Sequence, residues 1–228
     1  MSYQLCEDKI KAKVIALTLP VVDYIPDSEG LISYCARVSN EGNQLNFDTA
    51  EGLLKYCIRN AHWSIFEMSN VVVEIKVPRD ISRQVLRHRT SCFQEFSQRY
   101  AEVSEDMFCI REARMQDSID RQNSNQCTDE GLEQWWLNAQ ENHINNSKEL
   151  YELALSRGLA KEVARVVLPE GNTMSTLYMN ANMRTWLHYL KVRSGNGTQK
   201  EHIWLTDSVR EAMIDYMPTL LGMIKDNK

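Results

Sequence analysis

The β-branched run over residues 71–77 is the feature that most constrains the fold. It reads Val-Val-Val-Glu-Ile-Lys-Val, and β-branched side chains favour an extended, pleated backbone. Pro78 follows directly, and proline cannot supply the N–H that a strand ladder needs. Asp80 is then suited to cap a helix that runs towards Arg89. The sequence therefore predicts one clear strand that leads straight into a helix.

The rest of the chain predicts more helix than strand. A second strand is expected over residues 13–18, and a long helix over residues 131–156. Further helices are expected at 31–38, 48–60, 160–168, 182–193 and 201–224, with the polar stretch 114–130 as an exposed loop. No internal repeat, Gly/Ser linker or shift in composition divides the chain. We therefore expect a single α+β domain over residues 1–228, with a small and mostly antiparallel sheet and several helices.

Composition narrows the class of protein. The 26 basic and 31 acidic residues give a net charge of −5, which argues against a protein that coats nucleic acid. The six cysteines are scattered without a Cys-x-x-Cys pair, so neither a zinc site nor a redox dithiol is indicated. The N-terminus lacks a signal-peptide core, and no apolar run approaches the roughly 20 residues that span a bilayer. We expect a cytoplasmic protein with reduced thiols, without a metal ion, and without nucleic-acid or membrane partners.

Positive charge is concentrated between residues 76 and 100. This segment holds six basic and two acidic residues: Lys76, Arg79, Arg83, Arg87, Arg89 and Arg99, with Asp80 and Glu95. On a helix Arg87 and Arg89 would lie about 200° apart, suited to two anions or to the two ends of one ligand. A solvated charged surface is the alternative interpretation. Nearby apolar residues such as Val85 and Phe93 favour partial burial, and a buried arginine requires an anionic partner.

The order of residues in this segment resembles a known signature. Arg87-His88-Arg89, then seven residues, then Ser97 is similar to the signature of the flavin-dependent thymidylate synthases. The resemblance spans residues 30–205 in the family's order. It includes Ala36-Arg37-Val38-Ser39, His62-Trp63-Ser64-Ile65-Phe66-Glu67, Gln84, Gln94-Glu95-Phe96-Ser97-Gln98-Arg99-Tyr100, Lys161-Glu162-Val163-Ala164-Arg165, Leu168-Pro169, Asn182, Arg184 and Arg193.

The resemblance implies an activity. Members of that family methylate dUMP reductively to dTMP, with 5,10-methylenetetrahydrofolate as carbon donor, tetrahydrofolate as product and NADPH-reduced FAD as hydride donor. They are homotetramers whose active sites lie at subunit interfaces. We therefore expect this chain to bind FAD, dUMP, folate and NADPH, and to assemble as a homotetramer with shared active sites.

The resemblance also assigns residues to ligands. For dUMP it implies Gln84, Arg87, Glu95, Phe96, Ser97, Gln98, Arg99, Arg165 and Arg193, with the loop at 95–99 lent by the neighbouring subunit. For the flavin and its folate partner it implies Ser39, His62, Ser64, Glu67, Arg87, His88, Arg89, Glu95, Asn182, Arg184 and His188. Arg193 matches the catalytic arginine. A permanent cation beside the uracil ring stabilises the charge that makes carbon 5 nucleophilic.

The expected helix at 182–193 carries two polar stripes. Asn182, Tyr189 and Arg193 fall on one stripe, whereas Arg184 and His188 fall on the other. Two stripes suit two different ligands, or they are the two polar edges of an amphipathic helix.

Several features distinguish this chemistry from others. Neither Cys92 nor Ser97 has a sequence partner that would activate it, so we interpret Cys92 as a packing residue and Ser97 as a substrate contact. No Gly-x-Gly-x-x-Gly is present, so arginines and interface contacts would hold FAD. Gly197 and Thr198 stand where some relatives have His-Ala, which leaves one flavin contact open.

Two other functions are compatible with these residues. Arginines on one helix also bind the phosphates of nucleic acids, although the acidic net charge opposes that interpretation. A relative that binds a nucleotide without catalysis is the second alternative. The intact set of Arg87, Ser97, Arg165 and Arg193 favours the enzyme over it. Flavin absorbance of the purified protein separates the enzyme from the nucleic-acid-binding alternative.

Overall fold

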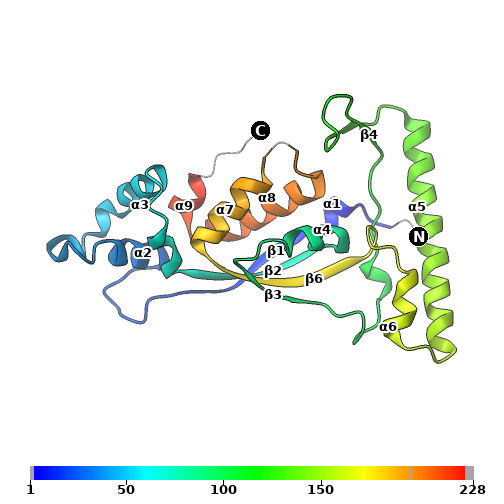
Figure 1. The fold of residues 1–228 in the computed structure, drawn as a ribbon, viewed down its shortest axis with the longest axis horizontal. Helices are drawn as coiled ribbons and strands as arrows, with labels where there is room; N and C mark the ends of the chain where they lie inside the picture. Colours follow the sequence, from blue (N-terminus) through cyan, green and yellow to red (C-terminus); the bar gives the residue numbers. More distant parts are fainter. Residues whose placement is uncertain (1–2, 196, 224–228) are drawn as a thin grey trace.

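The computed structural model describes residues 3–195 and 197–223. Figure 1 shows an elongated molecule with a sheet along its long axis, helices α2 and α3 at one end and the long helix α5 across the other. The helices are α1 (Cys6–Lys9), α2 (Ser28–Ala36), α3 (Ala50–Arg59), α4 (Arg79–Val85), α5 (Glu130–Ser156), α6 (Lys161–Ala164), α7 (Met183–Arg193), α8 (Lys200–Ile214) and α9 (Pro218–Gly222). The strands are β1 (Lys11–Leu17), β2 (Asn70–Pro78), β3 (Cys92–Glu95), β4 (Arg114–Gln116), β5 (Ser124–Gln126) and β6 (Met174–Asn182).

The central sheet is antiparallel throughout, with strand order β1-β2-β6-β3. The predicted β-branched strand is confirmed as β2, which pairs with β6 over its whole length. Its side chains alternate, so that Val71, Val73, Ile75 and Val77 are all buried in the main core. Pro78 ends the strand, as expected, and the α+β class with a small antiparallel sheet is also as expected.

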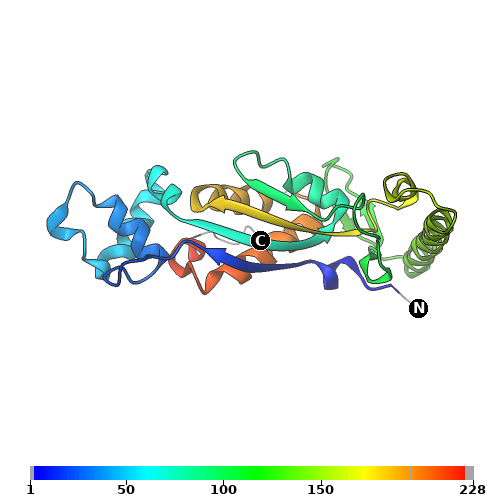
Figure 2. The same cartoon turned by 90° about the horizontal axis from the view of Figure 1, so that it is seen from below.

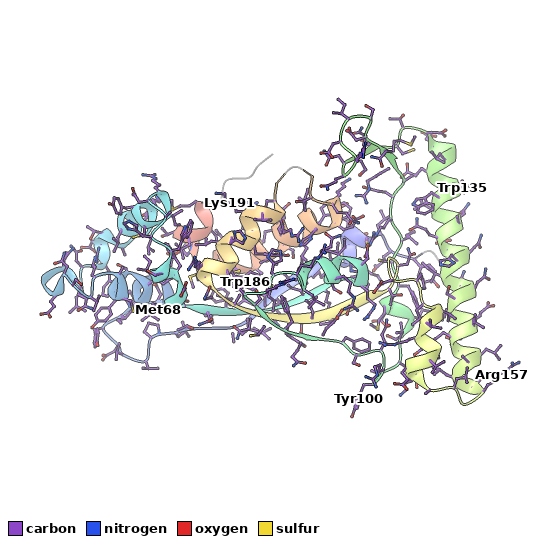
Figure 3. The ribbon with its side chains drawn as sticks, viewed as in Figure 1. Met68, Tyr100, Trp135, Arg157, Trp186 and Lys191 are labelled. Atoms are coloured by element: carbon purple, nitrogen blue, oxygen red, sulfur yellow. The ribbon has the colours of Figure 1, made fainter. Side chains whose placement is uncertain are left out.

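Helices α7 and α8 cover one face of the sheet (Figure 1). Trp186 of α7 is fully buried between this helix and the strands, where its indole N–H donates to the carbonyl of Val71 at 3.1 Å (Figure 3). Seen from below, the strands lie in front of α7 and α8 (Figure 2). On that side Tyr178 is exposed, and its hydroxyl donates to Glu74 at 3.0 Å. One face of the sheet thus forms the core and the other stays polar and open.

Helix α4 is shorter than predicted. We expected it to continue towards Arg89, but it ends at Val85 because the chain must turn to enter β3 at Cys92. Arg87 and Arg89 therefore lie in the turn between α4 and β3, with exposed side chains, and the prediction that a helix points them to opposite sides is wrong. Asp80 lies in the first turn of α4 rather than at its cap, which is Pro78.

The polar segment 114–130 contains more structure than predicted. Strands β4 and β5 pair as a hairpin within it, and the first residue of α5 closes it. The carboxylate of Asp117 accepts hydrogen bonds from the backbone of Ile119 and Asp120, both at 2.8 Å, which fixes the turn. Asp117 and Asp120 are typical turn-forming residues, so a local signal was present.

The helix expected at 201–224 is interrupted. Helix α8 ends at Ile214 and α9 begins at Pro218, because proline cannot donate the helical hydrogen bond of a helix interior. Residue 224 lies outside the described residues. The helix expected at 48–60 begins at Ala50, after Thr49 rather than Asp48. Within the described residues no helix is long and apolar enough to span a bilayer.

Candidate functional site

A polar cluster joins the end of α4 to α7 and α8. Arg193, the last residue of α7, donates from Nε to His88 Nε2 at 3.1 Å and from Nη2 to the backbone carbonyl of Gln84 at 3.3 Å. The side chain of Gln84 contacts α8 in turn, through Gln199 at 2.8 Å and His202 at 3.1 Å. We call these five residues, with Tyr189, the central cluster. The structure therefore brings together three predicted site residues, Gln84, His88 and Arg193.

The central cluster carries a single positive charge. Burial, together with the nearby Arg193 guanidinium, lowers the pKa of His88 to about 4. The same two causes, burial first, lower the pKa of His202 to about 3. Both imidazoles are therefore neutral at pH 7. No carboxylate forms an ion pair with Arg193 within the described residues, so its charge is available to a ligand.

A cavity of about 590 Å³ opens beside α7 and collects four predicted cofactor residues. It is lined by Trp63, Glu67, Thr90, Asn182, Arg184, Thr185, Leu187, His188 and Lys191. Glu67 accepts from Arg184 at 2.5 Å across this cavity. Asn182 lies before α7 and caps it, accepting from the Thr185 N–H at 3.0 Å. Asn182 therefore groups with Arg184 and His188, and the prediction that it shares a helical stripe with Arg193 is wrong.

A second cavity, of about 550 Å³, lies on the other side of α4 and is lined mostly by polar residues. Its lining is Arg79, Arg83, Gln98, Glu162, Arg165, Val166, Leu168, Glu170 and Thr173. Arg165 forms no ion pair within the described residues. Gln98 Nε2 and Arg79 Nη1 are buried, and no described residue forms a hydrogen bond with either. Buried donors of this kind are normally satisfied, so the cavity is suited to a ligand that presents oxygen acceptors.

Glu95 is held by groups of its own chain. It accepts from Ser82 at 2.8 Å and from Ser175 at 3.0 Å, and it pairs with Arg83 at 3.0 Å. Arg79 Nη1 lies 3.8 Å away, too far for a hydrogen bond. These contacts order the start of the 95–99 loop in the single chain. Arg99 farther along the loop pairs with Glu162 at 3.0 Å.

The other predicted residues lie apart from these groups. Ser39 lines a separate cavity of about 490 Å³ formed mainly by α2, α3 and the chain between them. His62 is exposed and packs edge-on against Tyr56, with ring centroids 5.7 Å apart. Ser64 and Ser97 are exposed, as are the arginines of the turn after α4, while Phe96 is half-buried. The described residues contain no group of His, Cys, Asp or Glu that would hold a metal ion.

Three members of the central cluster had no predicted role. Tyr189 was placed on the stripe of Arg193, and it does pack against His88 with ring centroids 4.8 Å apart. Gln199 directly precedes α8 and His202 lies in its first turn, and no motif marks them. Only the packing of α8 against α7 and α4 brings them to Gln84, so the sequence alone offered no signal for them.

Comparison with known proteins identifies the relatives of this chain. The family model described as "Thymidylate synthase complementing protein" matches residues 20–219. A probable flavin-dependent thymidylate synthase of Paramecium bursaria Chlorella virus 1 is 49% identical over 211 residues, covering 92% of this chain and 97% of the relative. A flavin-dependent thymidylate synthase of Synechocystis sp. is 45% identical over 216 residues, covering 93% and 98%.

A solved structure shares the fold. It is the UMP/dUMP methylase PolB of Streptomyces cacaoi bound with 5-Br UMP, which is 25% identical with a TM-score of 0.82, covering 97% of this chain and 96% of that one. A second structure of the same protein, bound with 5-Br dUMP, has a TM-score of 0.81.

Proposed function

This chain belongs to the family of flavin-dependent thymidylate synthases, which methylate dUMP to dTMP, and we propose that it uses FAD, 5,10-methylenetetrahydrofolate and NADPH to do so. The folate supplies the carbon and leaves as tetrahydrofolate. Reduced FAD, when bound, supplies the hydride. The family resemblance supports the folate as carbon donor and NADPH as reductant.

The uncompensated charge of Arg193 is the observation that carries the catalytic proposal. Its guanidinium is oriented by two neutral acceptors, His88 Nε2 and the Gln84 carbonyl, and is neutralised by no carboxylate of the described residues. Fixed donors that need no reorganisation stabilise charge where it develops. Arg193 placed beside the pyrimidine thus favours negative charge on the uracil ring and makes its carbon 5 nucleophilic.

The polar cavity beside Arg165 fits the phosphate of dUMP. Among the residues that the structure describes, Arg165 has no ion-pair partner, and Gln98 Nε2 and Arg79 Nη1 are buried donors without a hydrogen-bond acceptor. Charge-assisted hydrogen bonds to a phosphate satisfy all three. In the proposed assembly this cavity and the 95–99 loop of one subunit receive the nucleotide whose base lies at Gln84 and Arg193 of its neighbour.

The cavity beside α7 fits part of FAD. Its volume of about 590 Å³ lies in the usual range for ligand sites, and Trp63 and Leu187 supply an apolar wall. Arg184, His188 and Lys191 supply donors for a pyrophosphate. We propose that these residues hold FAD, with Arg87, His88 and Arg89 reaching it from the turn after α4.

Exposed apolar side chains support self-association into a homotetramer. On α5 the side chain of Trp135 is 60% exposed, and Leu150 and Leu153 are about half exposed (Figure 3). Val163 and Val166 extend this surface onto the segment at α6. Exposed apolar side chains on neighbouring packed elements, here α5 and the segment at α6, favour an interface between proteins. We place the enzyme in the cytoplasm, because all six cysteines are free thiols.

Reconstitution of the purified protein tests the proposed function. Incubation with FAD should give a yellow protein whose flavin bands shift when dUMP is added. With the folate donor and NADPH present, mass spectrometry should detect dTMP, and omission of either compound should abolish it. A folded protein that ignores excess FAD would overturn the proposal. Product formation without the folate or without NADPH would refute that co-substrate alone.

A further inference from the structure

We propose that His202 is a positioning residue for the nucleotide, because it holds the side-chain carbonyl of Gln84 and so fixes the direction in which the Gln84 amide faces dUMP. The inference rests on the proposed function, in which Gln84 contacts dUMP. His202 does not itself touch the substrate. It belongs to α8, and the family resemblance assigns it no role.

A chain of hydrogen bonds defines the direction of the amide. The Tyr189 hydroxyl lies 3.0 Å from His202 Nε2, and His202 Nδ1 lies 3.1 Å from Gln84 Oε1. Gln84 Nε2 then donates to Gln199 Oε1 at 2.8 Å. Because Gln84 Oε1 only accepts, His202 Nδ1 must carry the proton, and Nε2 must accept from Tyr189. Each donor in the chain therefore has one acceptor.

Burial keeps this chain in one state. His202 is fully buried, with a 0% exposed side chain, and Tyr189 is equally buried. Burial lowers the pKa of His202 and raises that of Tyr189, so both groups stay neutral at pH 7. A protonated imidazole would donate from both nitrogens and would leave the Tyr189 hydroxyl without its acceptor. The neutral Nδ1–H form is the one that satisfies both neighbours.

The consequence for binding follows from the donor count of glutamine. An amide has two N–H donors and two acceptor lone pairs. Gln84 uses one N–H on Gln199 and one lone pair on His202, which leaves one of each for a ligand. Without His202, Gln199 is the one described residue that holds the amide, and because the Gln199 amide can itself turn over, Gln84 can rotate by half a turn and exchange donor and acceptor. A nucleotide edge that matches one orientation is mismatched by the other.

The second anchor of Gln84 couples this residue to catalysis. Its backbone carbonyl accepts from Arg193 Nη2 at 3.3 Å, so the guanidinium and the amide share one residue as their support. His202 controls only the side chain, whereas Arg193 contacts only the backbone. Loss of His202 should therefore weaken nucleotide binding more than it slows the chemical step.

Paired substitutions at position 202 test the inference. His202→Leu removes the donor, and the dissociation constant of dUMP, measured by calorimetry, should rise about three- to tenfold, as expected for one lost hydrogen bond. KM for dUMP should rise in parallel, while kcat and the KM of the folate change less. His202→Asn places an amide N–H near the position of Nδ1, so it should recover most of the affinity.

A double-mutant cycle separates positioning from general loss of structure. In a Gln84→Ala background, His202→Leu should add no further increase, because no side chain remains to be oriented. Val209→Ala removes a buried side chain of the same helix and should lower Tm without changing dUMP affinity. The inference would be overturned if His202→Leu raised the dissociation constant equally with and without the Gln84 side chain, or if it caused no increase in the otherwise wild-type protein.

Tyr189→Phe keeps the inference testable if His202→Leu does not fold. The variant removes only the hydroxyl that fixes His202 Nε2 as an acceptor, and dUMP affinity should fall about two- to threefold, by a partial loss of one hydrogen bond. Unchanged dUMP affinity in Tyr189→Phe would refute the proposed chain of hydrogen bonds from Tyr189 through His202 to Gln84. Failure of the proposed function is distinguishable, because it would show as a wild-type protein that takes up no FAD and makes no dTMP. If the wild-type protein makes dTMP normally and the variants bind dUMP as tightly as it does, only the proposed role of His202 is refuted.

Discussion

Glu201→Gln is the substitution whose cost to stability follows most directly from the structure. Glu201 lies in the first turn of α8 and is fully buried, at 0% exposure. Its Oε1 accepts from Arg114 Nη2 and lies 3.7 Å from Arg111 Nε. Arg111 also donates to Asp80 at 2.6 Å. One buried carboxylate thus balances two largely buried guanidinium groups.

The magnitude follows from the loss of that balance. Removing one partner of a buried ion pair costs about 3–5 kcal/mol, because the remaining charge stays desolvated and unpaired. Glutamine keeps the size of the side chain and one acceptor, and Asp80 still pairs with Arg111. We therefore expect the lower end, about 3 kcal/mol. For a chain of this length that corresponds to a decrease of about 6–12 °C in Tm.

Thermal unfolding followed by circular dichroism measures the effect. Protein concentration must be fixed and FAD and dUMP left out, because ligands and partner subunits raise Tm by mass action. Glu51→Gln is the matched control, since the exposed Glu51 pairs with Lys55 one turn along α3 and touches no member of the buried group. Its loss should cost no more than about 1 kcal/mol. Equal shifts for the two variants, or an unchanged Tm for Glu201→Gln, would refute the buried-charge argument.

Three further predictions concern the site. Arg193→Lys keeps the charge but loses the planar guanidinium, so kcat should fall at least tenfold (about 1.4 kcal/mol). The affinity for FAD, measured by absorbance, should stay within twofold of the wild type. Equal losses of kcat and FAD affinity would show that another residue activates the uracil ring. Burial lowers the pKa of His88 to about 4 and that of His202 to about 3, from the ordinary histidine value of 6.5. Below pH 6.5 these two histidines therefore bind protons in the unfolded chain but not in the folded one. Their contribution to the free energy of unfolding is therefore full above pH 6.5 and should be lost as the pH drops towards 4. Tm should fall less steeply with decreasing pH in His202→Asn than in the wild type. The same slope of Tm against pH in both proteins would contradict this. Mixing inactive Arg87→Ala subunits with inactive Ser97→Ala/Arg99→Ala subunits should restore activity if sites are shared. Proven subunit exchange without recovery of activity would rule sharing out.

Local patterns predicted the elements that depend on local forces. The strand at 71–77 and the helix at 131–156 were confirmed as β2 and α5, because β-branched residues and helical spacing act within a short window. Strands β3 and β6 were missed. β6 reads Met-Ser-Thr-Leu-Tyr-Met-Asn-Ala-Asn and pairs with β2, so its extended form depends on a partner about a hundred residues away. Such pairing overrides weak local preference.

The same distinction holds within the site. The signature identified Gln84, His88 and Arg193, and the structure places them in contact. The predicted length of α4 was wrong because the start of β3 decides where the helix ends. Arg87 and Arg89 lie beyond that end, so helical spacing could not predict the angle between them. The sequence could not predict the role of His202, since a single histidine in a helix carries no signal until α8 packs against α4.

Charge balance connects the fold to the proposed reaction. Arg83, Arg111 and Arg184 each pair with a carboxylate, and they hold elements together. Arg165 and Arg193 have no such partner within the described residues, although both are half-buried. A half-buried cation costs free energy unless an anion meets it. The neutral histidines around Arg193 preserve that demand, because a carboxylate in their place would neutralise the guanidinium before any substrate arrived. The site therefore gives up some stability of the empty protein and recovers it when a nucleotide brings its phosphate and a charge-accepting ring.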